Sequence, residues 1–124
     1  MKKILIAAML ALLILLAACQ GSNPGKYDSL AKCMTEKGVV EYGAFWCSNC
    51  AKVKRDFGKS FQYINYIECD PRGENAQAQL CLEKDVKKTP TWTIEKDGVE
   101  VKRLVGYLNP KELSEFSGCP IGNE

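Results

Sequence analysis

The chain has 124 residues, with 17 basic and 15 acidic residues and no histidine. The absence of histidine excludes Cys–His nucleophilic catalysis, general-base catalysis by histidine and histidine metal sites. With the expected loss of Lys2 and Lys3 by processing, basic and acidic residues become equal in number, so no basic surface argues for a nucleic-acid partner. The remaining chain of about 100 residues fits one domain with one core.

The N-terminal segment is expected to lie outside the folded domain. Two lysines precede an unbroken apolar run of fifteen residues, Ile4 to Ala18, which is short for a membrane span but suits the hydrophobic region of a signal peptide. Its end, Leu16-Ala17-Ala18-Cys19, resembles the lipobox of prokaryotic lipoproteins, in which the cysteine is acylated. We therefore expect a signal peptide over residues 1–18 and a lipid-anchored tether over residues 19–26. An ordinary secretory signal and an uncleaved anchor are the alternatives.

From residue 27 onward, the hydrophobic pattern predicts alternating helices and strands. Asp97-Gly98 is typical of a hairpin turn, and Asn109 followed by Pro110 begins the last helix. The expected order is helix 27–37, strand 39–45, helix 47–57, strand 61–69, helix 74–85, paired strands 91–95 and 100–107, and a helix from 109 to about 118. A strand–helix–strand unit gives a parallel pair, and the hairpin adds antiparallel strands. We expect one α/β domain, residues 27–124, with a mixed sheet of about four strands and helices on both faces.

Cysteine is unusually frequent, with seven residues in the chain. If Cys19 carries lipid, an even number remains, which suits an exported domain in an oxidising compartment. The remaining cysteines are Cys33, Cys47, Cys50, Cys69, Cys81 and Cys119.

The segment Cys47-Ser48-Asn49-Cys50 lies between a predicted strand and a predicted helix. A helix N-terminus favours a thiolate, and a low-pKa thiol beside a second thiol is what dithiol–disulfide exchange requires. A static disulfide and half of a zinc site are the alternatives. Because an exported chain without histidine disfavours metal, we favour redox chemistry without a cofactor. Cys47 is then the attacking and more exposed thiol, and Cys50 is the shielded, resolving thiol.

The element order, with Cys-x-x-Cys at the first strand-to-helix junction, resembles a thioredoxin fold. Three further residues are similar to that family. Pro90, in Thr89-Pro90-Thr91, stands where thioredoxin-like proteins have a cis-proline that faces the dithiol; Gly106 follows the last strand; and Glu41 lies where thioredoxin has a buried aspartate. The resemblance implies that Pro90 belongs to the catalytic site.

A closer resemblance is to the thioredoxin-like domain fused to bacterial homologues of vitamin K epoxide reductase. The similar motifs are Tyr42-Gly43-Ala44-Phe45-Trp46-Cys47, Tyr66-Ile67-Glu68-Cys69-Asp70, Gln77-Ala78-Gln79-Leu80-Cys81 and Pro90-Thr91-Trp92. Two features depart from that family, which usually has Pro-His inside the dithiol and tends to lack an acid at position 41. Both differences bear on the redox potential, so the direction of electron flow stays open.

Several residues around the dithiol have two interpretations. Glu41 is expected to be a buried acid that exchanges a proton with Cys50, or else a strand residue whose carboxylate reaches solvent or pairs with a lysine. Trp46 is expected to dock the substrate, whereas Phe45 and Trp92 are as consistent with core positions. Thr89, through the backbone before Pro90, is expected to bind an extended substrate chain. The basic side chains after the dithiol form a solvated helix face in our interpretation, and they are Lys52, Lys54, Arg55 and Lys59. A weak stabilisation of the Cys47 thiolate by their charge is the alternative.

In the family resembled, cysteines that match Cys69 and Cys81 form a second disulfide. It is either structural, the interpretation that we favour, or a relay of electrons to the dithiol. Cys33 and Cys119 remain, in the first and last predicted helices. A disulfide that ties the ends of the domain together is expected, with two buried free thiols as the alternative.

Together these features predict an extracytoplasmic, membrane-anchored thiol–disulfide oxidoreductase on the periplasmic or cell-surface side. Its expected partners are exported cysteine-containing proteins and a quinone-linked or transmembrane thiol redox partner in the membrane, with no cofactor and no metal. We expect a monomer. The alternative is a non-enzymatic lipoprotein adaptor that uses the thioredoxin fold only as a disulfide-stapled scaffold.

Overall fold

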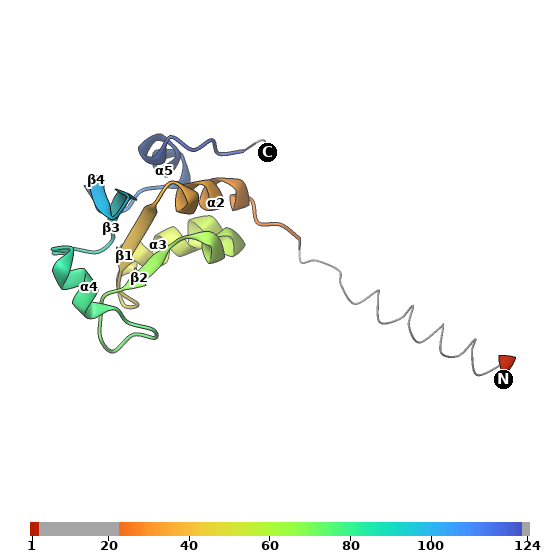
Figure 1. Ribbon diagram of the computed structural model, residues 1–124, viewed down its shortest axis with the longest axis horizontal. Helices are drawn as coiled ribbons and strands as arrows, with labels where there is room; N and C mark the ends of the chain where they lie inside the picture. Colours follow the sequence, from red (N-terminus) through yellow and green to blue (C-terminus); the bar gives the residue numbers. More distant parts are fainter. Residues whose placement is uncertain (3–22, 123–124) are drawn as a thin grey trace.

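The computed structural model describes residues 1–2 and 23–122. The apolar run and Cys19 lie outside the described residues. The described elements are α2 (Asp28–Glu36), β1 (Val39–Gly43), α3 (Ser48–Phe57), the 3₁₀ helix η1 (Gly58–Tyr63), β2 (Tyr66–Glu68), α4 (Ala78–Glu83), β3 (Thr91–Lys96), β4 (Val99–Val105) and α5 (Pro110–Ser117) (Figure 1). Among the described residues, no helix has the length and apolar character needed to cross a bilayer.

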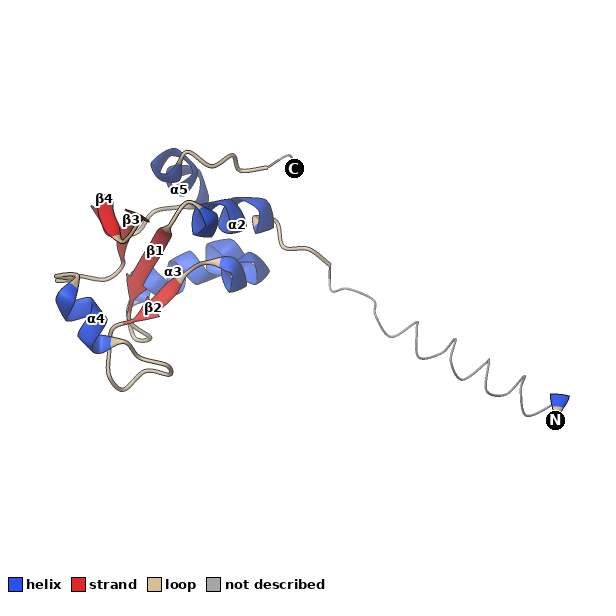
Figure 2. Ribbon diagram, in the orientation of Figure 1, coloured by secondary structure: helices blue, strands red, loops and turns tan. Residues whose placement is uncertain are grey.

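The four strands form one mixed sheet in the order β2-β1-β3-β4. The pair β1–β2 is parallel, while β3 pairs antiparallel with both β1 and β4. The parallel pair requires a crossover, and α3 with η1 provides it. This arrangement is the predicted α/β fold, with a four-stranded mixed sheet and helices on both faces (Figure 2).

Two hydrophobic clusters fill the space between the sheet and the helices. Helices α2, α3 and α5 cover one face, where Trp92 and Leu113 are fully buried. Helix α4 covers the other face through Cys81, which packs with Val40 and Tyr42 of β1. Because successive strand residues point to opposite faces, odd-numbered residues of β1 lie under α3.

The predicted strand from Phe61 to Cys69 is wrong over its first half. Residues Gly58–Tyr63 form a 3₁₀ helix, and β2 contains only Tyr66–Glu68. Gly58 takes a φ of 52°, which ends α3 but keeps the chain turning. Phe61 then packs 5.8 Å from the Tyr66 ring, measured between centroids, so aromatic residues that suggested a strand pack as a cluster instead.

The helix predicted over residues 74–85 is also shorter, since α4 spans only Ala78–Glu83. Asn75 has a φ of 52°, a left-handed conformation that a helix cannot contain. The loop is held back against β2 by a hydrogen bond from the Gln77 N–H to the Glu68 carbonyl at 2.8 Å. The strong helix propensity of this segment is therefore overridden by its attachment to the sheet.

Two disulfides fasten the domain. Cys33 in α2 bonds to Cys119 just after α5, and Cys69 after β2 bonds to Cys81 in α4. Their sequence separations are 86 and 12 residues. On the chain-entropy model, closing loops of these lengths stabilises the fold by about 4.5 and about 3 kcal/mol. The only free cysteines among the described residues are Cys47 and Cys50.

Candidate active site

The dithiol lies at the N-terminus of α3. Cys47 is the N-cap residue, and its sulfur accepts a hydrogen bond from the Cys50 N–H at 3.2 Å. The Cys47 thiol also donates to the Thr89 carbonyl at 3.4 Å. A sulfur that accepts hydrogen bonds at a helix N-terminus is stabilised as a thiolate.

These surroundings shift the pKa values of the two thiols in opposite directions. Burial by itself raises the pKa of Cys47, but hydrogen bonds from the Cys50 thiol and from the Cys50 and Asn49 N–H groups outweigh it, and the pKa lies below its usual value. Burial, followed by the hydrogen bond to Cys47, raises the pKa of Cys50 to about 12. Cys47 is therefore prepared to be a nucleophile, and Cys50 holds its proton until a base removes it.

Cys47 is less exposed than the sequence suggested. Its exposed fraction is 6%, against 1% for Cys50, because the Thr89 backbone packs over its sulfur. The order of exposure agrees with the expectation, but the Thr89 segment limits access to the Cys47 sulfur.

Glu41 is completely buried in the centre of β1. Neither of its carboxylate oxygens has a hydrogen-bond partner among the described residues. Burial raises the pKa of Glu41 to about 8, although the nearby charge of Lys54 lowers it and that of Cys47 raises it. The charge of Glu41 in turn contributes to the raised pKa of Cys50. The carboxylate of Glu41 therefore does not reach solvent. Glu41 is a buried titratable acid whose charge acts on a thiol of the dithiol.

The Thr89–Pro90 peptide bond is cis. Pro90 is buried and leads directly into β3, while Thr89 is partly exposed. Since Cys47 contacts the carbonyl of Thr89, the segment expected to bind substrate backbone does lie against the dithiol.

The aromatic residues divide between surface and core. Trp46 is 62% exposed and donates its indole N–H to Asp70 Oδ2 at 2.7 Å. Phe45 is 54% exposed, with the Arg72 guanidinium 5.8 Å from its ring centroid. Trp92, in contrast, is a core residue with no exposed surface. Trp46 and Phe45 therefore form an apolar rim beside Cys47, and Trp92 takes no part in it.

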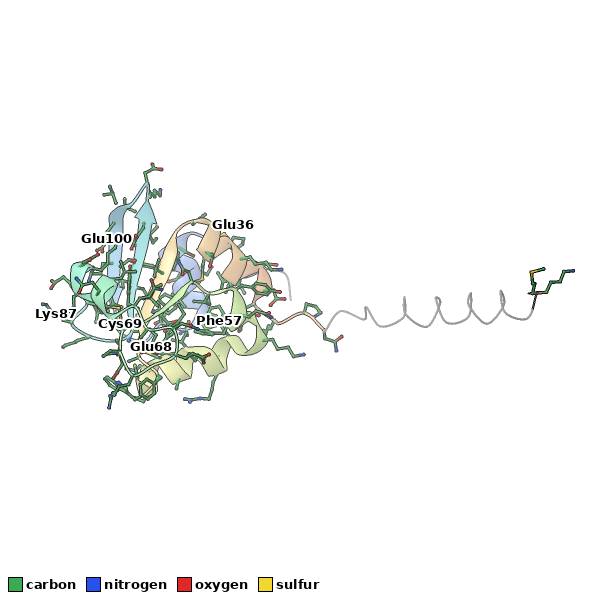
Figure 3. The ribbon with its side chains drawn as sticks, turned by 60° about the horizontal axis from the view of Figure 1, so that its bottom comes forward. Glu36, Phe57, Glu68, Cys69, Lys87 and Glu100 are labelled. Atoms are coloured by element: carbon green, nitrogen blue, oxygen red, sulfur yellow. A yellow bond between two sulfur atoms is a disulfide. The ribbon has the colours of Figure 1, made fainter. Side chains whose placement is uncertain are left out.

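A groove of about 500 Å³ adjoins the dithiol. On one side it is bordered by Trp46 and the loop after β2, and on the other by the loop that leads to Pro90. The lining residues are Ala44, Trp46, Cys69, Asp70, Pro71, Val86, Lys87, Lys88 and Thr89. Figure 3 labels Cys69 and Lys87 of this groove, with Glu68 beside Cys69. Through Thr89, the groove reaches the carbonyl that contacts the Cys47 sulfur.

Tyr66 and Glu68 were not among the expected site residues, and the structure places both on the Glu41 side of the sheet. Tyr66 and Glu68 alternate with the core residue Ile67 on β2, a period-two pattern that places both under α3. Lys54 was assigned to a solvated helix face, but it is only partly exposed and its ammonium lies 4.5 Å from the Tyr66 ring centroid. The other potential zinc ligands, Cys69 and Cys81, are bonded to each other.

A dithiol at the N-terminus of a helix, with its first sulfur against the carbonyl that precedes a cis-proline, defines a protein with a thioredoxin-type redox site. The family model named Thioredoxin matches residues 20–117, and the chain belongs to this family.

Similar proteins come from plants and from yeast. Thiol-disulfide oxidoreductase LTO1 of Arabidopsis thaliana is 35% identical over 97 residues, which are 75% of this chain and 24% of that protein. This chain thus spans about a quarter of the length of that relative. Protein disulfide isomerase-like 5-1 of Oryza sativa subsp. japonica is 25% identical over 122 residues, 92% of this chain and 83% of the relative. The oxidised form of mitochondrial thioredoxin 3 from Saccharomyces cerevisiae aligns at 22% identity with a TM-score of 0.48, over 74% of this chain and 85% of that one.

Proposed function

We propose that this protein is an extracytoplasmic, membrane-tethered thiol–disulfide oxidoreductase that works through Cys47 and Cys50. The observation that carries the exchange activity is the placement of the dithiol: Cys47 caps α3, accepts the Cys50 N–H at 3.2 Å and lies 3.4 Å from the Thr89 carbonyl. In keeping with this placement, the pKa of Cys47 is lowered and that of Cys50 is raised to about 12. A static disulfide needs no such difference. The plant relatives named as an oxidoreductase and a disulfide isomerase support the same activity.

The exchange proceeds in two substitutions at sulfur. The Cys47 thiolate attacks a disulfide of the partner protein, forms a mixed disulfide and releases one partner thiolate. Cys50 then passes its proton to Glu41 in its ionised form, which is the minority form below the carboxyl pKa of about 8, and attacks Cys47 Sγ, which expels the second partner thiolate. The two partner thiolates take up protons from Glu41 and from water. The protein ends with a Cys47–Cys50 disulfide, the partner with two thiols, and two electrons have moved to the partner. The same steps in reverse oxidise a partner dithiol.

The groove and its rim support a polypeptide substrate. Trp46 presents an exposed apolar ring that Asp70 holds in place, and Thr89 presents backbone next to Cys47. We assign the catalytic roles to Cys47, Cys50 and Glu41, with Pro90 shaping the substrate segment. Trp46, Thr89 and Pro90 bind the substrate, which we infer to be an exported protein with cysteines.

The tether is proposed from the sequence alone. A lipid on Cys19 would hold the dithiol near a membrane, where a quinone-linked or transmembrane thiol partner could restore its redox state. The resemblance to the thioredoxin-like domain of vitamin K epoxide reductase homologues supports such a partner. Metabolic labelling with a fatty acid tests the lipid: the label should enter the full chain and be absent from Cys19→Ala.

Trapping tests the activity. Cys50→Ser should accumulate mixed disulfides through Cys47, which a reductant releases and which identify the substrates. Cys47→Ser is the matched control and should trap nothing. The rival proposal, a lipoprotein adaptor, predicts no covalent complexes with Cys50→Ser and unchanged function in Cys47→Ser.

The direction of electron flow follows from the reduction potential of the Cys47–Cys50 pair. A value near −270 mV, typical of thioredoxin, would refute a role as an oxidant, whereas a value near −120 mV would support it.

A further inference from the structure

Tyr66, which is partly buried, and Glu68, which is buried, form a hydrogen-bonded pair on β2 that takes no part in the proposed exchange steps. The Tyr66 hydroxyl donates to Glu68 Oε2 at 2.8 Å, and Glu68 Oε1 accepts the Asp70 N–H at 2.9 Å. Glu68 is 5% exposed, and a carboxylate at such a site is tolerated because hydrogen bonds replace its water. The strand register pairs Tyr66 with Glu41, so both residues of the pair lie on the Glu41 face of the sheet.

Two glycines make room for this pair. A Cβ on Gly43 would lie 2.5 Å from Tyr66 Cε2, and a Cβ on Gly73 would lie 2.4 Å from Glu68 Cγ. Backbone therefore packs directly against the phenol ring at one position and against the carboxylate stem at the other. With its hydroxyl bonded to Glu68 and its ring against Gly43, Tyr66 has little freedom to move.

The Tyr66 ring in turn supports Lys54. The Lys54 ammonium lies 4.5 Å from the Tyr66 ring centroid and 5.4 Å from that of Phe61. Aromatic faces attract a cation, and a lysine on its flexible stem would otherwise extend into solvent. The rings of Phe61 and Tyr66 thus keep a cation close to the buried carboxyl of Glu41.

Lys54 is the cation that acts on Glu41. The groups that face Glu41 are Cys47, Cys50 and Lys54 from α3, Tyr66 from β2 and the uncharged indole of Trp92 from β3. Burial and the charge of Cys47 raise the pKa of Glu41, and among the residues that the structure describes it is the charge of Lys54 that lowers it.

We propose that Tyr66 is a positioning residue of the redox site: packed against Gly43, its ring holds the Lys54 ammonium where that charge acts on the Glu41 carboxyl. The inference rests on the proposed function, in which Glu41 accepts the proton of Cys50. Tyr66 touches neither substrate nor the reacting sulfurs in this role. It acts through Lys54, and its effect appears in the pH at which Glu41 ionises.

A direct titration tests the proposal. The midpoint for Glu41 is followed by NMR of its labelled carboxyl carbon in the dithiol form, with Glu41→Gln used to assign the signal. Lys54→Met removes the charge and should raise the midpoint by about one unit. Tyr66→Leu should raise it by a similar amount, while Tyr66→Phe, which keeps the ring, should stay close to the unmodified protein. In Lys54→Met, the further change Tyr66→Leu should add nothing.

Lys52→Met is the matched control. It removes the same charge from the same helix, but the Lys52 ammonium lies over the Tyr107 ring, so the midpoint should move by less than about 0.3 units. The proposal is overturned if Lys54→Met leaves the midpoint unchanged, if Tyr66→Phe shifts it as far as Tyr66→Leu, or if Tyr66→Leu still shifts it in Lys54→Met. Failure of the proposed function has a different signature, because the unmodified protein would then exchange no disulfides whatever the titration shows.

Discussion

The buried Glu41 should make the stability of this protein fall as the pH rises. The native carboxyl has a pKa of about 8 and no exposed surface, while an unfolded glutamate ionises near its ordinary value of about 4.3. Between these values the native state binds a proton that the unfolded state has released, so the stabilisation from a protonated Glu41 is complete below the unfolded pKa and is lost as pH rises through the native pKa. Between pH 5 and pH 8 the loss amounts to about 3 kcal/mol, from 1.36 kcal/mol per unit.

Glu41→Gln removes this titration. Its amide is buried in the same place at every pH, so the constant cost of burying it cancels when the two pH values are compared. Relative to the parent, the variant should therefore gain about 3 kcal/mol of unfolding free energy between pH 5 and pH 8. That change is a large part of the 5–15 kcal/mol that stabilises a typical domain.

The assay is urea unfolding at both pH values. Both proteins should carry Cys47→Ala and Cys50→Ala, so that the two disulfides stay oxidised and no free thiol reshuffles them. Glu115→Gln on the exposed side of α5 is the control for the loss of one negative charge. Its unfolding free energy should change between pH 5 and pH 8 by the same amount as that of the parent. If the unfolding free energy of Glu41→Gln changes between the two pH values as that of the parent does, within about 0.5 kcal/mol, then the native carboxyl is not protonated and burial does not raise its pKa.

Three further outcomes are expected. Alkylation mapped by mass spectrometry should modify Cys47 at a lower pH than a free cysteine and leave Cys50 unmodified until far higher pH, because their pKa values move apart; equal labelling of the two would contradict this. Asp70→Ala releases the Trp46 indole and should slow exchange with a disulfide peptide about fivefold, for about 1 kcal/mol of lost positioning, while the urea midpoint stays nearly constant; an unchanged rate would remove Trp46 from the substrate rim. Replacing the Cys33–Cys119 pair by serine should cost more unfolding free energy than replacing Cys69–Cys81, about 4.5 against about 3 kcal/mol, and the reverse order in urea unfolding would refute the loop-entropy reasoning.

Local patterns were sufficient to predict most of the fold. The turn at Asp97-Gly98 and the capping box at Asn109 lie where their sequence chemistry places them, because these signals depend on a few neighbouring residues. The prediction failed between Phe61 and Asp85, where the structure is decided by contacts distant in sequence. There, Phe61 packs on Tyr66, and the loop before α4 is hydrogen-bonded to β2. These tertiary contacts override the local strand and helix propensities.

The cysteines of the candidate site could be predicted from the sequence, but the charges that act on the buried acid could be predicted only in part. Cys47, Cys50 and Glu41 could be found because their spacing and the apolar strand around them are visible in the chain. The sequence allowed an effect of the helix lysines on Cys47, but the effect of Lys54 on Glu41 could not be found, because the position of Lys54 depends on the Tyr66 ring beside it. A charged residue on an amphipathic helix is usually solvated, but Lys54 is only partly exposed because Phe61 of η1 and Tyr66 of β2 lie beside its ammonium.

The Cys33–Cys119 bridge also gives the domain a mechanical property. A pulling force applied between residues before Cys33 and residues after Cys119 would pass through the covalent bond between α2 and the end of α5. The segment between these cysteines contains the whole sheet, the dithiol and the groove, and it would bear no tension while the bridge is intact. A protein pulled at both ends would keep its redox site in working geometry, and reduction of this one bond would expose that site to the load.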